Sequence, residues 1–111
     1  MTGLLRSVLF IAAAAALLLP SAGARADQID GHWCHADGRN LSIEGSMIIT
    51  PGGNEIVGDY RCHSFFYTVP ADEPNPGTKI AMQQLNDLVM QMLKEGDQEA
   101  QTWRRCNAPT A

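Results

Sequence analysis

The chain lacks the sequence features that would assign it to several large functional classes. Eight basic residues face 12 acidic ones, and aromatic residues make up only 6%, so the basic footprint of a nucleic-acid-binding protein is missing. There is no Walker A or dinucleotide-binding glycine motif, and no serine stands in a Gly-x-Ser-x-Gly turn. At 18% charged residues, the chain also differs from a highly charged disordered protein. We therefore expect one small, non-catalytic domain that does not bind nucleic acid.

Residues 1–26 are organised like a cleaved secretory signal. Arg6 provides a positive charge ahead of the apolar run 8–19, and residues 24–26 read Ala-Arg-Ala, with small residues at the positions that cleavage requires. The apolar run is shorter than the roughly 20 residues that a transmembrane helix needs. We therefore expect no membrane anchor, and we expect residues 27–111 to be a single small β domain in the periplasm or the medium.

The three cysteines all fall within the expected mature chain, which suits disulfide formation in an oxidising compartment. Three cysteines allow three single-bridge pairings. We predict the pair Cys34–Cys106, because it closes the longest loop and in the chain-entropy treatment stabilises the fold by ~4 kcal/mol. Cys62 is then expected to be a free thiol, with a link to another chain as the alternative, and we expect the protein to be a monomer.

Turn-forming residues recur at short intervals along the expected mature chain. Asp37-Gly38 favours a hairpin turn, and the segments 51–54 and 70–77 are rich in proline and glycine. Short runs with the composition or alternation of β-strands lie between these turns. These runs are residues 33–35, 41–43, 47–50, 55–62 and 64–69.

The segment 79–95 fits two different structures. Its composition favours a helix, and five apolar residues have helical spacing. The same segment also reads as a hairpin, in which Ile80 and Met82 alternate with polar neighbours and Asn86-Asp87 forms the turn. Local pattern alone favours the helix. The residues with helical spacing are Leu85, Leu88, Val89, Met92 and Leu93.

Four short motifs resemble a group of small exported proteins of Gram-negative bacteria that have no assigned function. The motifs are Gly31-His32-Trp33-Cys34, Thr50-Pro51-Gly52-Gly53, Gly58-Asp59-Tyr60 and Trp103-Arg104-Arg105-Cys106. The Gly-x-Trp start and the arginines near the end are also similar to those of lipocalin-like barrels, in which the tryptophan packs under an arginine where the barrel closes. The resemblance implies that Trp33 and either Arg104 or Arg105 close a barrel here.

This resemblance favours the hairpin structure for residues 79–94. It implies an all-β meander or barrel of about eight short strands, in which the first and last strands meet and a final strand spans residues 101–105. Such a meeting would bring Cys34 and Cys106 together. We therefore predict an all-β fold, and the alternative is an α+β fold with one amphipathic helix near residues 79–95.

One group of residues has the chemistry to bind zinc or copper. On a strand, however, alternate side chains point to opposite faces, and the chain contains no Cys-x-x-Cys motif. We therefore predict that the protein holds no metal or other cofactor, and we retain a metal-binding carrier as the second alternative function. The group consists of His32, Cys34, His35, Cys62 and His63.

An aromatic run and a proline-rich loop are the candidate partner contacts. Strand alternation places Phe66 on the face opposite to its two aromatic neighbours. Pro70, Pro74 and Pro76 make the following loop rigid, which lowers the entropic cost of binding. We expect an exported binding domain for a protein partner or a small ligand. The first alternative is a periplasmic inhibitor of a lysozyme or protease that inserts residues 71–77 into the enzyme's cleft.

Overall fold

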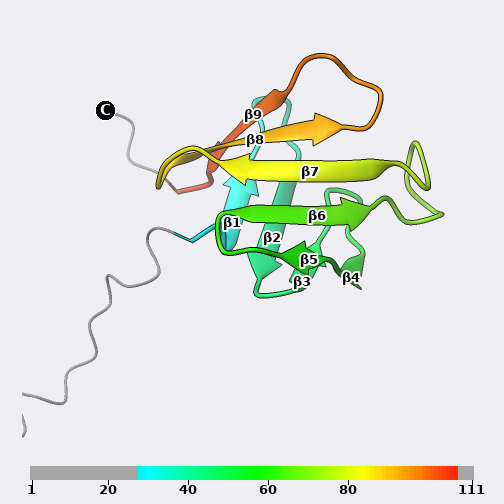
Figure 1. Cartoon of the computed structure of the whole chain (residues 1–111), viewed down its shortest axis with the longest axis horizontal. Helices are drawn as coiled ribbons and strands as arrows, with labels where there is room; N and C mark the ends of the chain where they lie inside the picture. The colour runs from blue at the N-terminus through cyan, green and yellow to red at the C-terminus, as the bar shows by residue number, and fades with distance from the viewer. Residues whose placement is uncertain (1–27, 108–111) are drawn as a thin grey trace, which may run out of the picture.

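The computed structural model describes residues 28–107, which form one antiparallel sheet of nine strands (Figure 1). The predicted all-β fold is confirmed, and the predicted signal segment 1–26 lies outside the described residues. The strands are β1 (Gly31–Cys34), β2 (Asn40–Glu44), β3 (Met47–Ile49), β4 (Glu55–Val57), β5 (Asp59–Tyr60), β6 (Ser64–Thr68), β7 (Lys79–Gln84), β8 (Val89–Lys94) and β9 (Gln101–Arg105).

A single glycine joins the two edges of this sheet. The strand order is β4-β3-β2-β1-β9-β8-β7-β6-β5, so β4 and β5 are the edge strands, yet only Gly58 separates them in the chain. The Gly58 N–H donates to the carbonyl of Ser46 at 2.8 Å, and a Cβ at Gly58 would overlap the ring of Phe65. The chain bends at this point, so that β4 pairs with β3 and β5, directly after the bend, pairs with β6. The sheet is thus a nearly closed barrel, and β4 and β5 together make one bent strand of the predicted eight.

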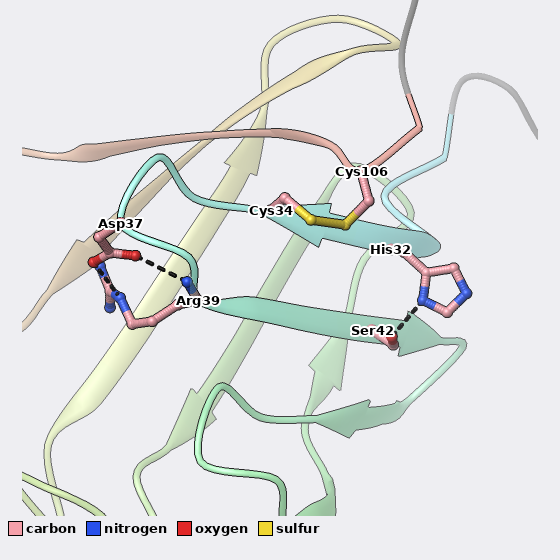
Figure 2. The surroundings of a disulfide bond; sticks show 6 residues. All are labelled: His32, Cys34, Asp37, Arg39, Ser42 and Cys106. Carbon is pink, nitrogen blue, oxygen red and sulfur yellow. Dashed lines mark hydrogen bonds and ion pairs between the residues drawn. A yellow bond between two sulfur atoms is a disulfide. The ribbon is translucent and has the colours of Figure 1, made fainter.

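The first and last strands meet, as predicted. Trp33 pairs with Arg105 and Cys34 with Arg104 in antiparallel register. Cys34 and Cys106 form a disulfide across this seam, with Cα atoms 4.9 Å apart (Figure 2). The predicted pairing is therefore confirmed, and Cys62 is a half-buried free cysteine.

Residues 79–94 form the hairpin of β7 and β8 rather than a helix. Strand alternation turns Ile80, Met82, Met90 and Met92 into the barrel interior, where all four are buried. The leucines of the helical pattern are exposed, and Leu85 is 55% exposed. The helical spacing in this segment was therefore coincidental, because pairing with β6 and β9 determines the structure.

Large side chains fill the middle of the barrel. Trp33, Trp103, Phe65 and Met90 have no exposed surface, and close packing of this kind is typical of small barrels. Ile29, from the segment before β1, is also fully buried, and its carbonyl accepts a hydrogen bond from the Trp33 indole at 2.8 Å. The interior therefore leaves room for a ligand only towards the ends of the strands.

Because all strands are antiparallel, their connections fall into two groups at opposite ends of the barrel. We call one the closed end and the other the open end. The closed end contains the connections 45–46, 61–63 and 85–88 together with the segment 28–30. The open end contains the connections 35–39, 50–54, 69–78 and 95–100.

Candidate functional site

An arginine seals the closed end. The guanidinium of Arg105 lies 4.1 Å from the centre of the Trp33 ring. It donates hydrogen bonds to the backbone carbonyls of Gln28, Asp30 and Asp87. Burial lowers the pKa of Arg105, and the nearby acids Asp87 and Asp30 oppose that shift. Of the two arginines predicted to close the barrel, Arg105 contacts Trp33, whereas Arg104 is exposed.

The side chain of Asp30 links two other segments at the closed end. The Asp30 carboxylate accepts the Gly45 N–H at 2.8 Å and the Tyr60 hydroxyl at 2.5 Å. This hydrogen bond, together with burial, raises the pKa of Tyr60 to about 12. The backbone of Ile29 donates to the carbonyl of Cys62 at 2.8 Å. The polar groups of the closed end thus hold together the segments of the chain that meet there.

The open end contains a hollow of about 290 Å³. Its walls include four inward-facing side chains that continue the core, namely Tyr67, Val69, Ile80 and Met92. Its rim is polar and carries both signs of charge. An apolar floor with a few polar groups above it is the usual form of a small-molecule site. The polar residues of the rim include Arg39, Glu73, Lys94 and Gln101.

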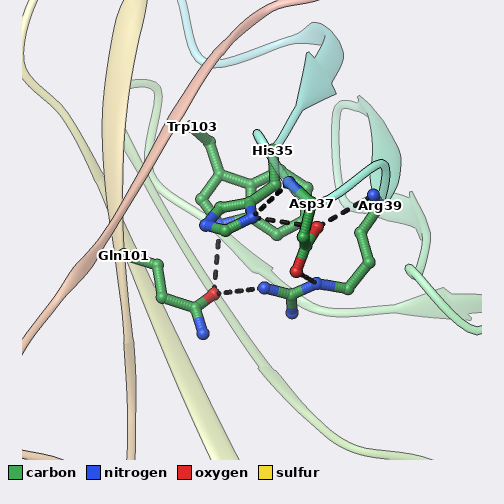
Figure 3. A network of polar contacts seen from close by, with 5 residues as sticks. All are labelled: His35, Asp37, Arg39, Gln101 and Trp103. Carbon is green, nitrogen blue, oxygen red and sulfur yellow. Dashed lines mark hydrogen bonds and ion pairs between the residues drawn. The ribbon is translucent and has the colours of Figure 1, made fainter.

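A network of side chains fixes the first rim cation, Arg39 (Figure 3). Its guanidinium donates to the carboxylate of Asp37 at 2.7 Å and to Gln101 Oε1 at 3.0 Å. It also lies 5.1 Å from the centre of the Trp103 ring. The backbone N–H of Arg39 is the largest cause of the low pKa of Asp37, which is about 2. His35 completes the network, 2.9 Å from Asp37 and against Trp103.

The rim acid, Glu73, is occupied by neutral partners. Its carboxylate accepts the Thr50 hydroxyl at 2.5 Å and the Asn54 side-chain N–H at 2.7 Å. These bonds join the proline-rich loop to the turn between β3 and β4. A Cβ at Gly52 would overlap the Glu73 side chain, so the two segments approach closely. Burial, and then the charge of Glu73, raises the pKa of Tyr67 to about 12.

The second rim cation, Lys94, is held more loosely. It is the last residue of β8 and continues the inward-facing positions Met90 and Met92. Its ammonium group lies 4.0 Å from the carboxylate of Asp97, at the limit of an ion pair. Lys94 can therefore turn towards a negatively charged group in the hollow at little cost.

The histidines and cysteines of the candidate metal group are separated. Cys34 lies in the disulfide, and His35 packs on Trp103. His32 lies within 2.6 Å of the Ser42 hydroxyl on the outside of the barrel. Within residues 28–107, no three histidine, cysteine or acidic side chains come together in a way that could hold a metal ion.

The candidate partner contacts lie in two places. Phe66 is 40% exposed on the outside of β6, with the Arg61 guanidinium 5.7 Å from its ring centre. Pro74 lines the hollow, whereas Pro76 is exposed on the loop and Pro70 is half-buried. The loop of the prediction thus borders the open end, and Phe66 belongs to a separate outer surface.

Sequence reasoning did not single out the rim residues Arg39, Glu73, Lys94 and Gln101. Comparison with known protein families, curated proteins and solved structures finds no match for this chain. Among the described residues, no helix is long and apolar enough to span a membrane. The open end, with its hollow and charged rim, is therefore the candidate functional site.

Proposed function

We propose that this protein is an exported, non-catalytic binding domain whose open end takes a small ligand with an apolar body and an anionic group. The observation that carries the proposal is the hollow at the open end, which has apolar walls and two rim cations. The disulfide between Cys34 and Cys106 is compatible with an oxidising location outside the cytoplasm, as is the signal-like segment 1–26.

Two features of the rim support an anionic ligand, namely the engaged carboxylate of Glu73 and the presence of the cations Arg39 and Lys94. The carboxylate of Glu73 accepts hydrogen bonds from Thr50 and Asn54, so it is already used within the fold. Arg39 places a guanidinium at the rim, and the ammonium group of Lys94 lies 4.0 Å from its acidic neighbour, Asp97. A charge-assisted hydrogen bond to either cation would be among the stronger polar contacts that a ligand can make.

The size of the hollow limits the ligand. A volume of about 290 Å³ is at the lower end of the range for small-molecule sites. Below the hollow, Trp103 and Met90 are fully buried, so a long hydrocarbon chain cannot run down the barrel axis. We propose that the apolar end of the ligand rests on Val69, Ile80 and Met92.

The Tyr67 hydroxyl adds a hydrogen-bond donor at the same place. Because its pKa is raised to about 12, this side chain stays protonated at neutral pH. It therefore donates to an acceptor oxygen and does not act as a base near neutral pH. This behaviour supports a role in recognition.

Binding of three eight-carbon probes tests the proposal. Octanoate, octanol and octylamine share an apolar chain and differ in charge, and calorimetry with the purified protein compares their affinities. We expect octanoate to bind most tightly and Lys94→Gln to weaken it about tenfold, which equals ~1.4 kcal/mol. Lys79→Gln is the matched control, because Lys79 is exposed on the outer surface of β7. Equal affinities for all three probes, or equal effects of the two substitutions, would contradict the proposal.

A second function, inhibition of a lysozyme or protease, is favoured by the bracing of the proline-rich loop. Glu73 anchors this loop to Thr50 and Asn54, so the loop can enter an enzyme cleft with little loss of entropy. Replacement of residues 71–77 by a Gly-Ser linker should abolish inhibition of a panel of such enzymes. Lysozymes or proteases that the wild-type protein leaves fully active would count against this function.

A further inference from the structure

A second hollow lies on the outside of the barrel, over β1 to β4. It is a groove of about 400 Å³ that runs along the side of the sheet, away from the rim of the open end. Met47 and Ile49 of β3 line it, and Ile49 is 47% exposed. The neighbouring Val57 of β4 is 69% exposed. Exposed apolar side chains that gather beside a groove are a common sign of an interaction surface.

The strand register sets the layout of this groove. Glu44 of β2 pairs with Met47 of β3, which pairs with Val57 of β4. Two residues further along β3, Ile49 pairs with Glu55 of β4. The two glutamates therefore lie on opposite sides of β3 and two residues apart along the strands. With ordinary strand spacing, their backbone positions are roughly 12 Å apart.

The charge of the groove is of one sign. Its charged side chains are Asp30, Glu44 and Glu55, and no lysine or arginine lines it. Asp30 is engaged with Gly45 and Tyr60. Across residues 28–107, neither Glu44 nor Glu55 makes an ion pair or a side-chain hydrogen bond. The two glutamates are thus exposed anions that flank an apolar strip, and no cation in the described part of the chain pairs with them.

The groove on the opposite side of the barrel does not share this property. It has a volume of about 440 Å³, and its apolar centre is formed by Phe66, Ala81 and Leu93. Two lysines and three acidic residues line it, so cations of this chain lie beside its acidic groups and the groove does not carry charge of one sign. The charged residues of this groove are Asp59, Lys79, Lys94, Glu95 and Asp97.

We propose that the groove over β1 to β4 binds an extended, basic segment of a partner protein. In an extended chain, side chains at positions i, i+2 and i+4 share one face, and positions i and i+4 are roughly 13 Å apart. A segment with cations at i and i+4 and an apolar residue at i+2 therefore matches the glutamates and the strip between them. The cations pair with Glu44 and Glu55, and the apolar residue packs on Met47 and Ile49. This inference is independent of the function proposed for the open end.

A synthetic peptide provides the probe. Its sequence, Ser-Lys-Ser-Leu-Ser-Lys-Ser with both ends blocked, carries the two cations and the apolar residue at the required spacing. A control peptide has glutamine in place of both lysines. Nuclear magnetic resonance titration of the purified protein identifies the amides that shift and gives the affinity. We expect the largest shifts at Met47, Ile49 and Val57, and weaker binding as salt is added.

Paired variants test the charges. Loss of two exposed ion pairs in the double variant Glu44→Gln/Glu55→Gln should weaken peptide binding roughly fivefold. The double variant Glu95→Gln/Glu99→Gln removes the same charge from exposed positions away from this groove and should bind like the wild-type protein. Both variants should keep well-dispersed spectra, because all four side chains are exposed.

Four outcomes would overturn the inference. The first is that the wild-type protein does not bind the lysine peptide. The second is that the shifted amides lie on another face of the barrel. The third is that the two double variants bind the peptide with equal affinity. The fourth is that the glutamine peptide binds as tightly as the lysine peptide.

Discussion

The two ends of the barrel use similar residues for opposite purposes. At the closed end, the guanidinium of Arg105 bonds to backbone carbonyls and covers Trp33. At the open end, the guanidinium of Arg39 covers Trp103 in the same way, but its hydrogen bonds go to the side chains of Asp37 and Gln101. An arginine over a tryptophan therefore seals a barrel when backbone groups from several segments hold it. It borders a hollow when rim side chains hold it.

Removal of the disulfide should have the largest effect, because the disulfide crosses the seam that both ends share. The double variant Cys34→Ala/Cys106→Ala should lower the free energy of unfolding by about 4 kcal/mol, as measured by urea denaturation. Cys62→Ala is the control, since Cys62 makes no disulfide. A loss no larger than that of the control would show that the packing of β1 on β9 alone holds the seam.

Substitution of the two arginines should show directly that the two ends have different roles. Arg105→Ala should lower the free energy of unfolding by about 3 kcal/mol, because it removes charge-assisted hydrogen bonds and a cation–π contact. Arg39→Ala should cost about 1 kcal/mol, because the carboxylate that it pairs with is exposed. The affinity for octanoate should show the reverse order: Arg39→Ala should lower it, and Arg105→Ala should leave it unchanged. Equal losses of stability would remove the distinction between the ends.

Titration of two tyrosines should give the smallest effect and the sharpest contrast. The pKa of both Tyr60 and Tyr67 is raised to about 12, at the closed end by the hydrogen bond to Asp30 and at the open end by burial. A raised pKa in the folded state means that the associated stability is complete below pH 10 and is lost as the pH rises from about 10 to 12.

Ultraviolet absorbance of the phenolate groups measures this contrast. Asp30→Asn should lower the pKa of Tyr60, because the Tyr60 hydroxyl loses its charged acceptor. The pKa of Tyr67 should stay the same. The control Tyr67→Phe removes the absorbance change of Tyr67, so the pKa that Asp30→Asn changes can be assigned to Tyr60. If Asp30→Asn changes the pKa of both tyrosines or of neither, the hydrogen bond to Asp30 is not the separate cause of the raised pKa of Tyr60.

The sequence predicted much of the fold, because the signals for it were local or concerned the two ends of the chain. The strand 101–105 was predicted with the bounds that it has, and the Asp37-Gly38 turn joins β1 to β2. The helical spacing in residues 79–95 misled local reasoning, since Leu85 and Leu88 lie at a turn between strands. Only the expectation that the first and last strands meet made the hairpin the better prediction.

The candidate site was harder to predict, because its residues meet through long-range register. Arg39 and Gln101 are separated by 62 residues and are joined by one hydrogen bond. Glu73 looked like one acid among many in a loop, and its bonds to Thr50 and Asn54 follow from how two turns pack. Lys94 ends a strand whose inward face depends on which residues pair. No local motif identifies such positions.

The hydrogen bonds of Arg105 also determine how the molecule can be presented to its surroundings. They hold Gln28 against the last strand, and Cys106 bonds to His32 nearby, so the first and last described residues leave the barrel at the same end. A tag, a fusion partner or a surface tether attached at either position therefore leaves the open end pointing outwards. The same proximity makes the chain suitable for circular permutation, with new termini placed in an exposed connection of the open end.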